Sequence, residues 1–246
     1  MLHQTKGIVL NRIQYGETSL IVHVYTEKFG RQAYMLKGSR SKKSKSKSNL
    51  FRPFFLLEME VYHKEGKNIQ SLKEVRLTET LNNLIFDVEK STIALFLTEV
   101  LSKVLREEEA NQELFVFLYN CIRYLDLCEE SIQNFHLYFL TKLTRFLGFY
   151  PQLNWSEKYS IFDMDNGRFV EEVNSHAHCL NKMDSETLYS LFNTSIDELE
   201  CLKIKHKESD SVLRGVLNFY ALQSQGFSSL KSLSVIRELF KEDEEL

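Results

Sequence analysis

Positive charge is concentrated in one short stretch of this chain. Residues 28–57 contain nine Lys or Arg and no Asp or Glu, although the whole chain has a formal net charge of −3. At the centre, residues 37–47 place cations between Ser and Gly, a composition that cannot build an apolar core but attracts a phosphate backbone. The sequence therefore predicts that this basic segment, residues 37–47, contacts nucleic acid.

The side chains expected to contact phosphate lie in the basic segment or close to it. They are Arg31, Lys37, Arg40, Lys42, Lys43, Lys45, Lys47 and Arg52. Aromatic residues on neighbouring strands could add base stacking, which is the usual partner of backbone attraction in single-strand binding. The candidates are Tyr15, Tyr25, Tyr34 and Tyr62, each of which also suits a protein core.

Histidines and cysteines in the C-terminal half raise the question of zinc. The available ligands are His176, His178, Cys179, Cys201 and His206. Structural zinc normally takes ligands in close pairs at both ends of the site, whereas Cys201 and His206 are farther apart and the chain has no Cys-x-x-Cys. We therefore expect no metal and no other cofactor.

The acidic residues do not form the spaced pairs that catalysis needs. The runs 107–109 and 242–245 read as solvated charge, with the further hypothesis that the second run competes with DNA for the basic segment. Asp163 and Asp165 could be nuclease ligands, but a hairpin turn explains them more simply. No glycine-rich phosphate loop precedes a helix, so we expect a protein that is not an enzyme.

The elements that must position the basic segment are strands. Apolar residues alternate with period two in five short runs, expected at 7–13, 18–26, 31–37, 54–62 and 68–76. Five antiparallel strands within about eighty residues are typical of a small barrel of the OB type. We therefore predict an OB-fold nucleic-acid-binding domain at residues 1–80.

Beyond residue 80 the apolar period changes to 3.6, as in Leu84, Ile85, Val88, Leu97, Val100, Leu101, Val104 and Leu105. Further helices are expected at 113–127, 132–147, 184–193, 195–203, 209–223 and 230–241. Ser131 would cap the start of the second and Gly148 its end. We predict a multi-domain α+β protein with a helical domain at 81–151, a small insert at 152–182 with a hairpin turn at 165–167, and C-terminal helices at 183–246 that pack on the helical domain.

Charge and composition restrict the cellular setting. Residues 1–80 carry a net charge of +8 and residues 81–246 a net charge of −11. Four irregularly spaced cysteines do not form a disulfide framework, and no apolar run reaches the roughly 18 residues that a membrane span requires. A cytoplasmic protein with no membrane partner is expected.

Several motifs in this order resemble the bacterial recombination and repair mediator family RecO. They are Gly7-Ile-Val-Leu, Tyr15-Gly-Glu-Thr-Ser-Leu, Tyr25-Thr-Glu-Lys-Phe-Gly-Arg31, Lys37-Gly-Ser-Arg40 and Leu50-Phe-Arg-Pro-Phe54 near the N-terminus, then residues 139–151 and 230–239. The resemblance covers nearly the whole chain. It implies an OB domain, a helical domain and, in many relatives, a four-cysteine zinc site. This chain has Asn154-Trp155 there instead, so we expect Trp155, Phe162 and Phe169 to hold the insert.

The resemblance also implies a function and partners. It implies binding of single- and double-stranded DNA, annealing of complementary strands, association with the nucleoid, and cooperation with RecR to load RecA on DNA covered by the single-stranded DNA-binding protein SSB. Lys142 and Arg145 are candidates for binding the acidic SSB C-terminal tail, although both could simply solvate a helix face. The open alternative is a protein-interaction adaptor whose basic segment binds an acidic partner.

Overall fold

The chain forms two compact units, Met1–Leu127 and Cys128–Leu246. This computed structural model describes residues 1–36, 48–105, 109–129, 132–173 and 178–240. Each unit has its own set of buried apolar side chains. None of the described helices is both long and apolar enough to cross a membrane.

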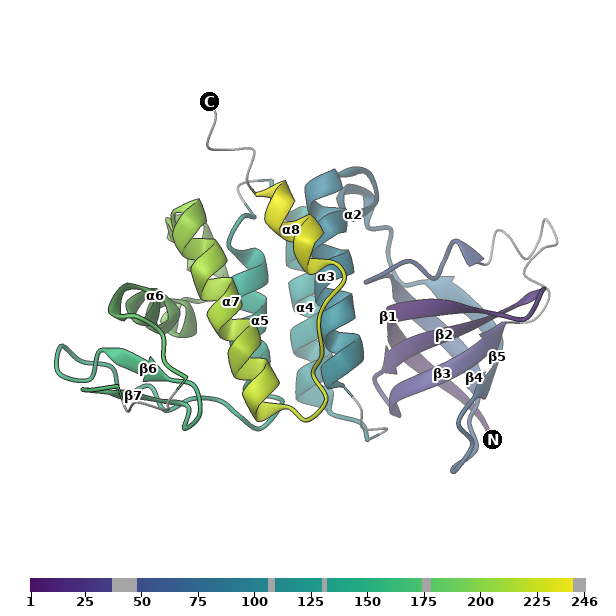
Figure 1. Ribbon diagram of the computed structural model, residues 1–246. Helices are drawn as coiled ribbons and strands as arrows, with labels where there is room; N and C mark the ends of the chain where they lie inside the picture. The colour runs from purple at the N-terminus through teal and green to yellow at the C-terminus, as the bar shows by residue number, and fades with distance from the viewer. Residues whose placement is uncertain (37–47, 106–108, 130–131, 174–177, 241–246) are drawn as a thin grey trace. The chain divides into compact units, whose positions relative to one another are not determined.

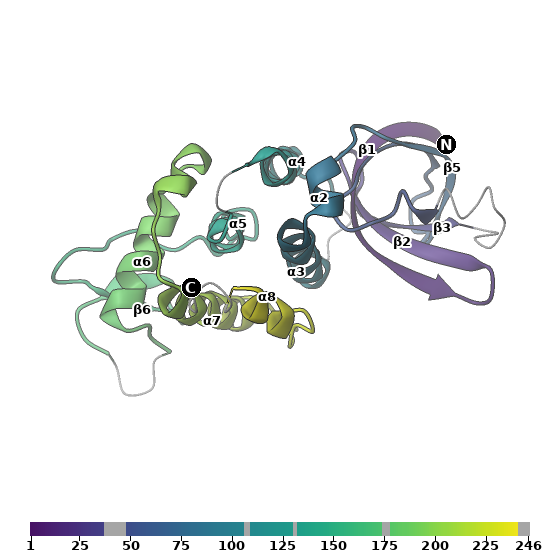
Figure 2. The same cartoon turned by 90° about the horizontal axis from the view of Figure 1, so that it is seen from above.

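Five strands of the first unit close into a barrel, which confirms the predicted OB-type fold (Figures 1 and 2). They are β1 (Leu2–Tyr15), β2 (Ser19–Thr26), β3 (Gly30–Leu36), β4 (Leu56–Tyr62) and β5 (Gln70–Leu77), in the order β1-β2-β3-β5-β4. The expected antiparallel pairing was wrong for one pair of neighbours, because the third and fifth strands pair in parallel. The first strand is longer than predicted because it has two partners in succession. It pairs with β4 from Leu2 to Ile8 and with β2 from Gly7 to Tyr15, and this double pairing closes the ring.

Gly7 lies where β1 passes from one partner strand to the other, paired with Thr26 on β2 and Leu57 on β4. A Cβ atom at this position would lie 2.5 Å from Val24 Cγ1 and 2.9 Å from Met59 Sδ. Both side chains belong to the buried barrel core, so a side chain here would displace the core. Glycine is required at this point for close packing rather than for an unusual backbone angle.

The barrel core follows the predicted alternation along the strands. Val22 and Val24 are fully buried on β2, and Leu57 and Val61 are fully buried on β4. Between these positions, alternate residues such as His23 are more exposed. The period-two pattern therefore identified the inward face correctly.

In the described part of the first unit, three helices follow the barrel: α2 (Asn82–Phe86), α3 (Val88–Val104) and α4 (Gln112–Leu127). Asp87 caps α3 by accepting a hydrogen bond from the Lys90 backbone N–H at 3.0 Å. Leu97 and Leu101 are fully buried, as the helical period predicts, but Val88 is 72% exposed. Val88 was expected on the same helical face as these leucines. This expectation was wrong, because Val88 is the first residue of α3 and lies outside the packed face.

The second unit contains α5 (Phe135–Leu143), α6 (Lys182–Asn193), a 3₁₀ helix η1 (Ile196–Cys201), α7 (His206–Gln223) and α8 (Leu233–Leu239). The helix predicted at 132–147 is shorter than expected. It begins after Asn134, while Ser131 lies outside the described residues. From Arg145 to Leu147, each backbone N–H donates to the carbonyl three residues earlier, as in a 3₁₀ helix. Gly148 then has a φ of 80°. These bonds end the α-helix early.

The insert is a small hairpin of β6 (Ile161–Asp163) and β7 (Arg168–Val170), so the turn predicted at 165–167 is confirmed. Phe162 and Phe169 are buried, with ring centroids 5.1 Å apart. Trp155 stacks on Tyr189 of α6 at 5.2 Å. As expected, aromatic contacts hold the insert against the helices of the second unit.

Candidate nucleic-acid interface

The predicted phosphate contacts divide into two groups. Six of them, Lys37, Arg40, Lys42, Lys43, Lys45 and Lys47, lie outside the described residues. The structure describes both neighbours of that segment, Leu36 at the end of β3 and Ser48 beyond it, and also Arg31 and Arg52. The candidate interface is therefore described from the residues that adjoin the two ends of the basic segment.

Arg52 is exposed between two buried phenylalanines. Phe51 and Phe54 are fully buried, and the Phe54 N–H donates to the Val9 carbonyl on β1 at 2.9 Å. Phe54 also has a φ of 65°, an uncommon angle for a bulky residue. Its burial and its bond to β1 hold this strained turn, which presents the Arg52 side chain to solvent.

Arg12 is a further cation beside the basic segment and was not among the predicted phosphate contacts. It is exposed near the far end of β1, and its Nη1 donates to the Ser48 carbonyl at 2.9 Å. Ser48 directly follows the basic segment, so Arg12 lies at that segment's end. No local signal marks it, because 36 positions separate Arg12 from Ser48 and only the barrel register brings them together.

Arg31 is bound to a helix end within the same unit. Its Nη1 donates to the backbone carbonyls of Ser102 at 2.9 Å and Leu105 at 2.5 Å. These carbonyls lie at the C-terminal end of α3, where a cation is favourable. Together with burial, which has the larger effect, the Arg31 charge lowers the pKa of His23 on β2. These contacts give Arg31 a structural role that joins the barrel to α3.

The four candidate tyrosines divide between core and surface. Tyr25 and Tyr34 are buried, whereas Tyr15 is 54% and Tyr62 is 50% exposed. Tyr15 ends β1, three residues after Arg12, and Ile13 between them is also 54% exposed. By strand alternation Tyr15 and Ile13 share one face, and Arg12 points to the other. An exposed aromatic ring is a group on which single-stranded bases can stack.

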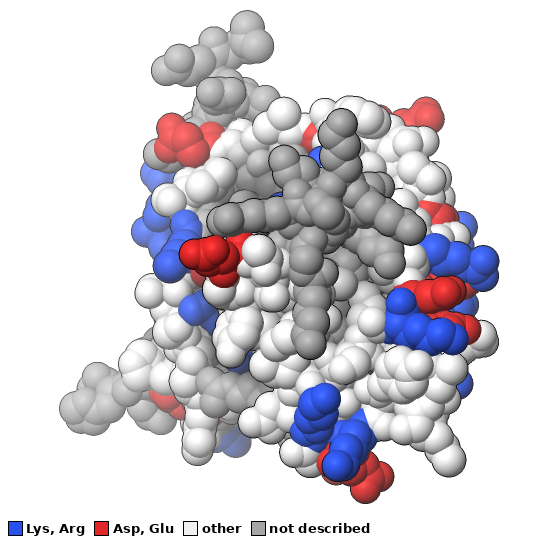
Figure 3. Space-filling model, turned by 90° about the vertical axis from the view of Figure 1, so that its right-hand side faces the viewer, with Lys and Arg blue, Asp and Glu red and all other residues white. Residues whose placement is uncertain are grey.

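On β5 two described cations are compensated by glutamates of β4. Arg76 and Lys73 on β5 pair with Glu58 and Glu60 on β4 at 2.5 and 2.9 Å. Figure 3, which faces the barrel, shows basic and acidic side chains adjoining one another in the described part of the surface. A groove of about 510 Å³ over these strands is lined by four glutamates as well as by Lys6, Lys28 and Arg76. Its mixed charge does not favour a polyanion.

Lys142 and Arg145, the two candidates for binding the acidic SSB C-terminal tail, differ in exposure. Lys142 is half-buried on α5, and its Nζ donates to the Phe192 carbonyl at 2.6 Å. Burial lowers the pKa of Lys142, and the nearby Glu198 carboxylate partly opposes this effect. Arg145 is exposed in the turns that follow α5. Arg145 is therefore the more accessible of the two.

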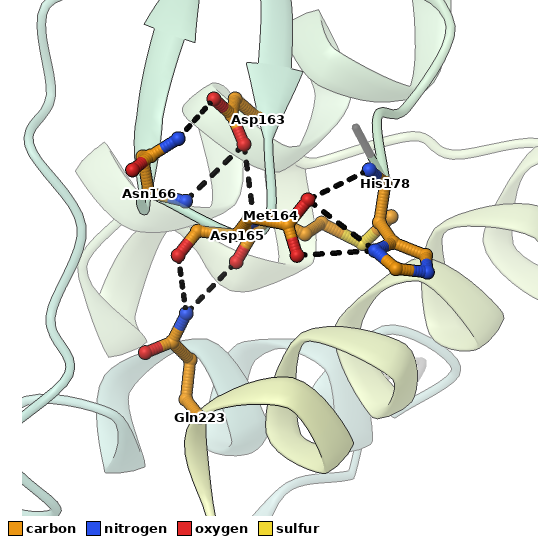
Figure 4. Close-up of polar contacts among 6 residues, drawn as sticks. All are labelled: Asp163, Met164, Asp165, Asn166, His178 and Gln223. Carbon is orange, nitrogen blue, oxygen red and sulfur yellow. Dashed lines mark hydrogen bonds and ion pairs between the residues drawn. The ribbon is translucent and has the colours of Figure 1, made fainter. Parts of the chain in front are cut away.

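The carboxylates of the insert serve the hairpin turn (Figure 4). Asp163 accepts hydrogen bonds from the backbone N–H groups of Asp165 and Asn166, and from Asn166 Nδ2 at 2.8 Å. Asp165 accepts from the backbone and ring of His178, which lowers the Asp165 pKa. Gln223 of α7 donates to the Met164 and Asp165 carbonyls. The hydrogen bonds within this turn satisfy these polar groups.

This arrangement bears on the metal-dependent alternatives. Within the described ranges no three His, Cys, Asp or Glu side chains come together in a manner that could hold a metal ion. His176 lies outside those ranges. The positions of Asp163 and Asp165 thus favour the turn over nuclease ligands as the reason for these residues.

Comparison with known proteins supplies the family. Residues 1–81 match the family described as "Recombination protein O N terminal", and residues 85–234 match "Recombination protein O C terminal". Proteins named "DNA repair protein RecO" are similar over nearly the whole length. The one from Azobacteroides pseudotrichonymphae is 35% identical over 98% of this chain and 100% of its own. Those from Phocaeicola vulgatus and Porphyromonas gingivalis are 36% and 29% identical, with the same coverage.

These matches agree with the closed five-stranded barrel, the helices that follow it and the motifs found in the sequence. Both family matches together span most of the chain. The chain belongs to the RecO family of bacterial DNA repair proteins.

Proposed function

We propose that this chain binds single- and double-stranded DNA through the basic segment, together with Arg12 and Arg52 beside it. The observation that carries this proposal is the distribution of charge on the first unit. Cations on β5 are paired with glutamates, whereas the basic segment contains six cations and no acidic residue. A run of cations with no acidic residue in its sequence favours phosphate as a partner, because binding releases the counterions of the nucleic acid.

Binding of this kind supports annealing without a catalytic residue. Two complementary strands repel one another, and a basic surface that screens both lowers the barrier to pairing. Phosphate contacts carry no sequence information, so strands held this way can slide into register. We propose annealing as the activity of this chain, with Tyr15 and Tyr62 as stacking candidates.

The proposal includes protein partners. The RecO family implies work with RecR to load RecA on single strands covered by SSB, and nucleoid association would follow from DNA binding. Arg145 is exposed, and Lys142 lies beside it in sequence on α5. These two cations remain our candidates for the acidic SSB tail, with Arg145 expected to contribute more.

The salt dependence of binding tests the DNA proposal. For Z phosphate contacts on a single strand, log K falls with log salt at a slope of about −0.7Z. Neutralising Lys42, Lys43, Lys45 and Lys47 to Gln should flatten this slope by about one to three units. The matched control is Lys64→Gln with Lys67→Gln, two exposed lysines on the loop between β4 and β5.

The outcomes separate DNA binding from the adaptor alternative. An unchanged slope in the four-lysine variant would show that the basic segment does not contact DNA. Absence of measurable single-strand affinity at moderate salt would favour an adaptor that binds an acidic protein. Strand annealing on SSB-coated oligonucleotides, with and without RecR, then tests the mediator role.

A further inference from the structure

A second group of cations lies in the second unit, just before and within the start of α7. Lys203 and Lys205 are exposed in the extended segment after η1, while Leu202 and Ile204 between them are half-buried. Lys207 is exposed in the first turn of α7. None of these three lysines forms an ion pair with a residue that the structure describes. We call Lys203, Lys205 and Lys207 the lysine strip.

A pocket of about 340 Å³ adjoins the lysine strip. Its lining includes the cationic or polar residues Lys205, His206, Asn134 and Ser209, and the apolar residues Ile204 and Phe240. Phe240 ends the described chain, and its ring stacks on His136 at 5.1 Å. The start of α7 and the end of α8 lie at the same end of the second unit (Figure 1). The pocket thus combines positive charge with an aromatic side.

The residues that follow Phe240 have the complementary charge. Residues 241–246 read Lys-Glu-Asp-Glu-Glu-Leu, with four consecutive carboxylates at 242–245. Six residues can extend about 20 Å, and Phe240 lines the same pocket as Lys205. The carboxylates therefore begin within reach of the lysine strip, whatever the path of the segment.

We propose that the acidic segment 242–245 binds the lysine strip and adjoining pocket of its own chain. A short tether gives a bound partner an effective concentration of about a millimolar, so an interaction with a dissociation constant of about 0.1 mM is populated intramolecularly and resists a free competitor about tenfold. The segment would supply carboxylates to three lysines that have no carboxylate partner among the described residues. This interaction is independent of the DNA proposal because it involves only the second unit.

Competition by a free peptide tests the proposal. The probe is a fluorescent peptide with the sequence of residues 240–246. It should bind a chain that ends at Phe240, and also the full chain with Glu242→Gln, Asp243→Asn, Glu244→Gln and Glu245→Gln, at least about tenfold more tightly than the unmodified chain. In the chain that ends at Phe240, Lys203→Glu with Lys205→Glu should abolish binding of the peptide. Lys182→Glu in the same chain should not, because Lys182 is an exposed lysine on α6, outside the lysine strip. Equal binding to unmodified and truncated chains would overturn the proposal.

Carbodiimide cross-linking of the full chain locates the segment directly, because it joins a carboxylate to an ammonium group in contact with it. Mass spectrometry should find residues 242–245 joined to Lys203, Lys205 or Lys207. In a mixture of isotopically light and heavy protein, the joined peptides should be of one isotope only. Links to the basic segment instead, or mixed-isotope links, would show a different occupant and overturn the proposal.

Discussion

The guanidinium of Arg31 on β3 lies 2.5 Å from the carbonyl oxygen of Leu105, the residue that caps the end of α3. The two residues are 74 positions apart, so this bond joins the barrel to a helix of the same unit. Asn11 on β1 adds a second link, donating to Ser102 Oγ at 2.9 Å. The end of α3 is thus anchored to the barrel through β1 and β3, the two strands on either side of β2.

Arg31→Gln should lower the stability of the first unit by about 1.5–3 kcal/mol, because it removes charged hydrogen bonds to two helix carbonyls. The salt dependence of DNA binding should not change. Arg52→Gln is the matched comparison, since Arg52 is exposed. It should leave stability within about 0.5 kcal/mol and flatten the salt slope by about 0.7. Denaturant unfolding and titration at several salt concentrations measure both effects, and a flattened slope for Arg31→Gln would restore it as a phosphate contact.

Tyr15→Ala should weaken single-strand binding by about tenfold, since loss of base stacking costs roughly 1–3 kcal/mol. Tyr34→Phe is the control, because Tyr34 is fully buried. Burial raises the Tyr34 pKa, and its hydroxyl has no hydrogen-bond partner in the described part of the chain. Removing that hydroxyl should leave DNA affinity unchanged and stabilise the unit by about 1 kcal/mol. Equal affinities of Tyr15→Ala and the unmodified chain would exclude Tyr15 as a stacking residue.

Gly7→Ala should destabilise the barrel by about 1–3 kcal/mol, because the new methyl group overlaps Val24 and Met59 in the core. Gly16→Asn provides a contrast. Gly16 has a φ of 62° with open space around it, and Asn tolerates this conformation. Thermal unfolding should show a clear loss for the first variant and little change for the second. Similar losses in both would show that crowding at Gly7 is not the cause.

Asp163→Ala should cost the second unit about 2–3 kcal/mol, because Asp163 is buried and its loss leaves turn donors without an acceptor. Asp165→Ala should cost less than Asp163→Ala, since the pair of Asp165 with His178 is exposed. Excess EDTA should leave the unfolding midpoint of the unmodified chain unchanged. A fall in that midpoint with EDTA would reveal a structural metal and contradict a turn held by hydrogen bonds alone.

His136→Gln should reduce the sensitivity of the second unit to acid. Burial lowers the pKa of His136 from 6.5 to about 3 in the folded chain, partly opposed by a backbone hydrogen bond with Gln133. Between these two values the unfolded chain binds a proton that the folded chain does not. The free energy of unfolding is therefore highest above pH 6.5. It decreases by about 1.4 kcal/mol for each unit by which the pH is lowered below 6.5. Urea unfolding between pH 7.5 and 5.5 should show a smaller slope in the variant, and identical slopes would contradict this assignment.

Much of the fold was predictable because its signals are local. Alternation of apolar residues located all five barrel strands, and the Asn166-Gly167 turn located the hairpin between β6 and β7. Helix boundaries were less certain. The helix predicted to begin at residue 132 begins at Phe135, because hydrogen bonding and packing, rather than periodicity alone, decide where a helix starts.

The candidate interface was only partly predictable. Composition identified the basic segment. Arg52 was also predicted as a phosphate contact, and its side chain is exposed. Arg12 was missed because it is adjacent to Ser48 only through the path of β1 around the barrel. Arg31 was included with the DNA contacts because its charge is visible in the sequence, while its helix-end partners are not.

The amino-acid pattern alone predicted where positive charge is concentrated, which residues face the barrel core and which family the motifs resemble. These properties depend on neighbours two to four positions away, or on composition. The tertiary structure decided how each cation is used: Arg31 at a helix end, Lys142 on the Phe192 carbonyl, and Arg12 and Arg52 in solvent beside the basic segment. The partner of a long side chain is set by strand register and helix packing across many tens of residues, and no local pattern encodes it.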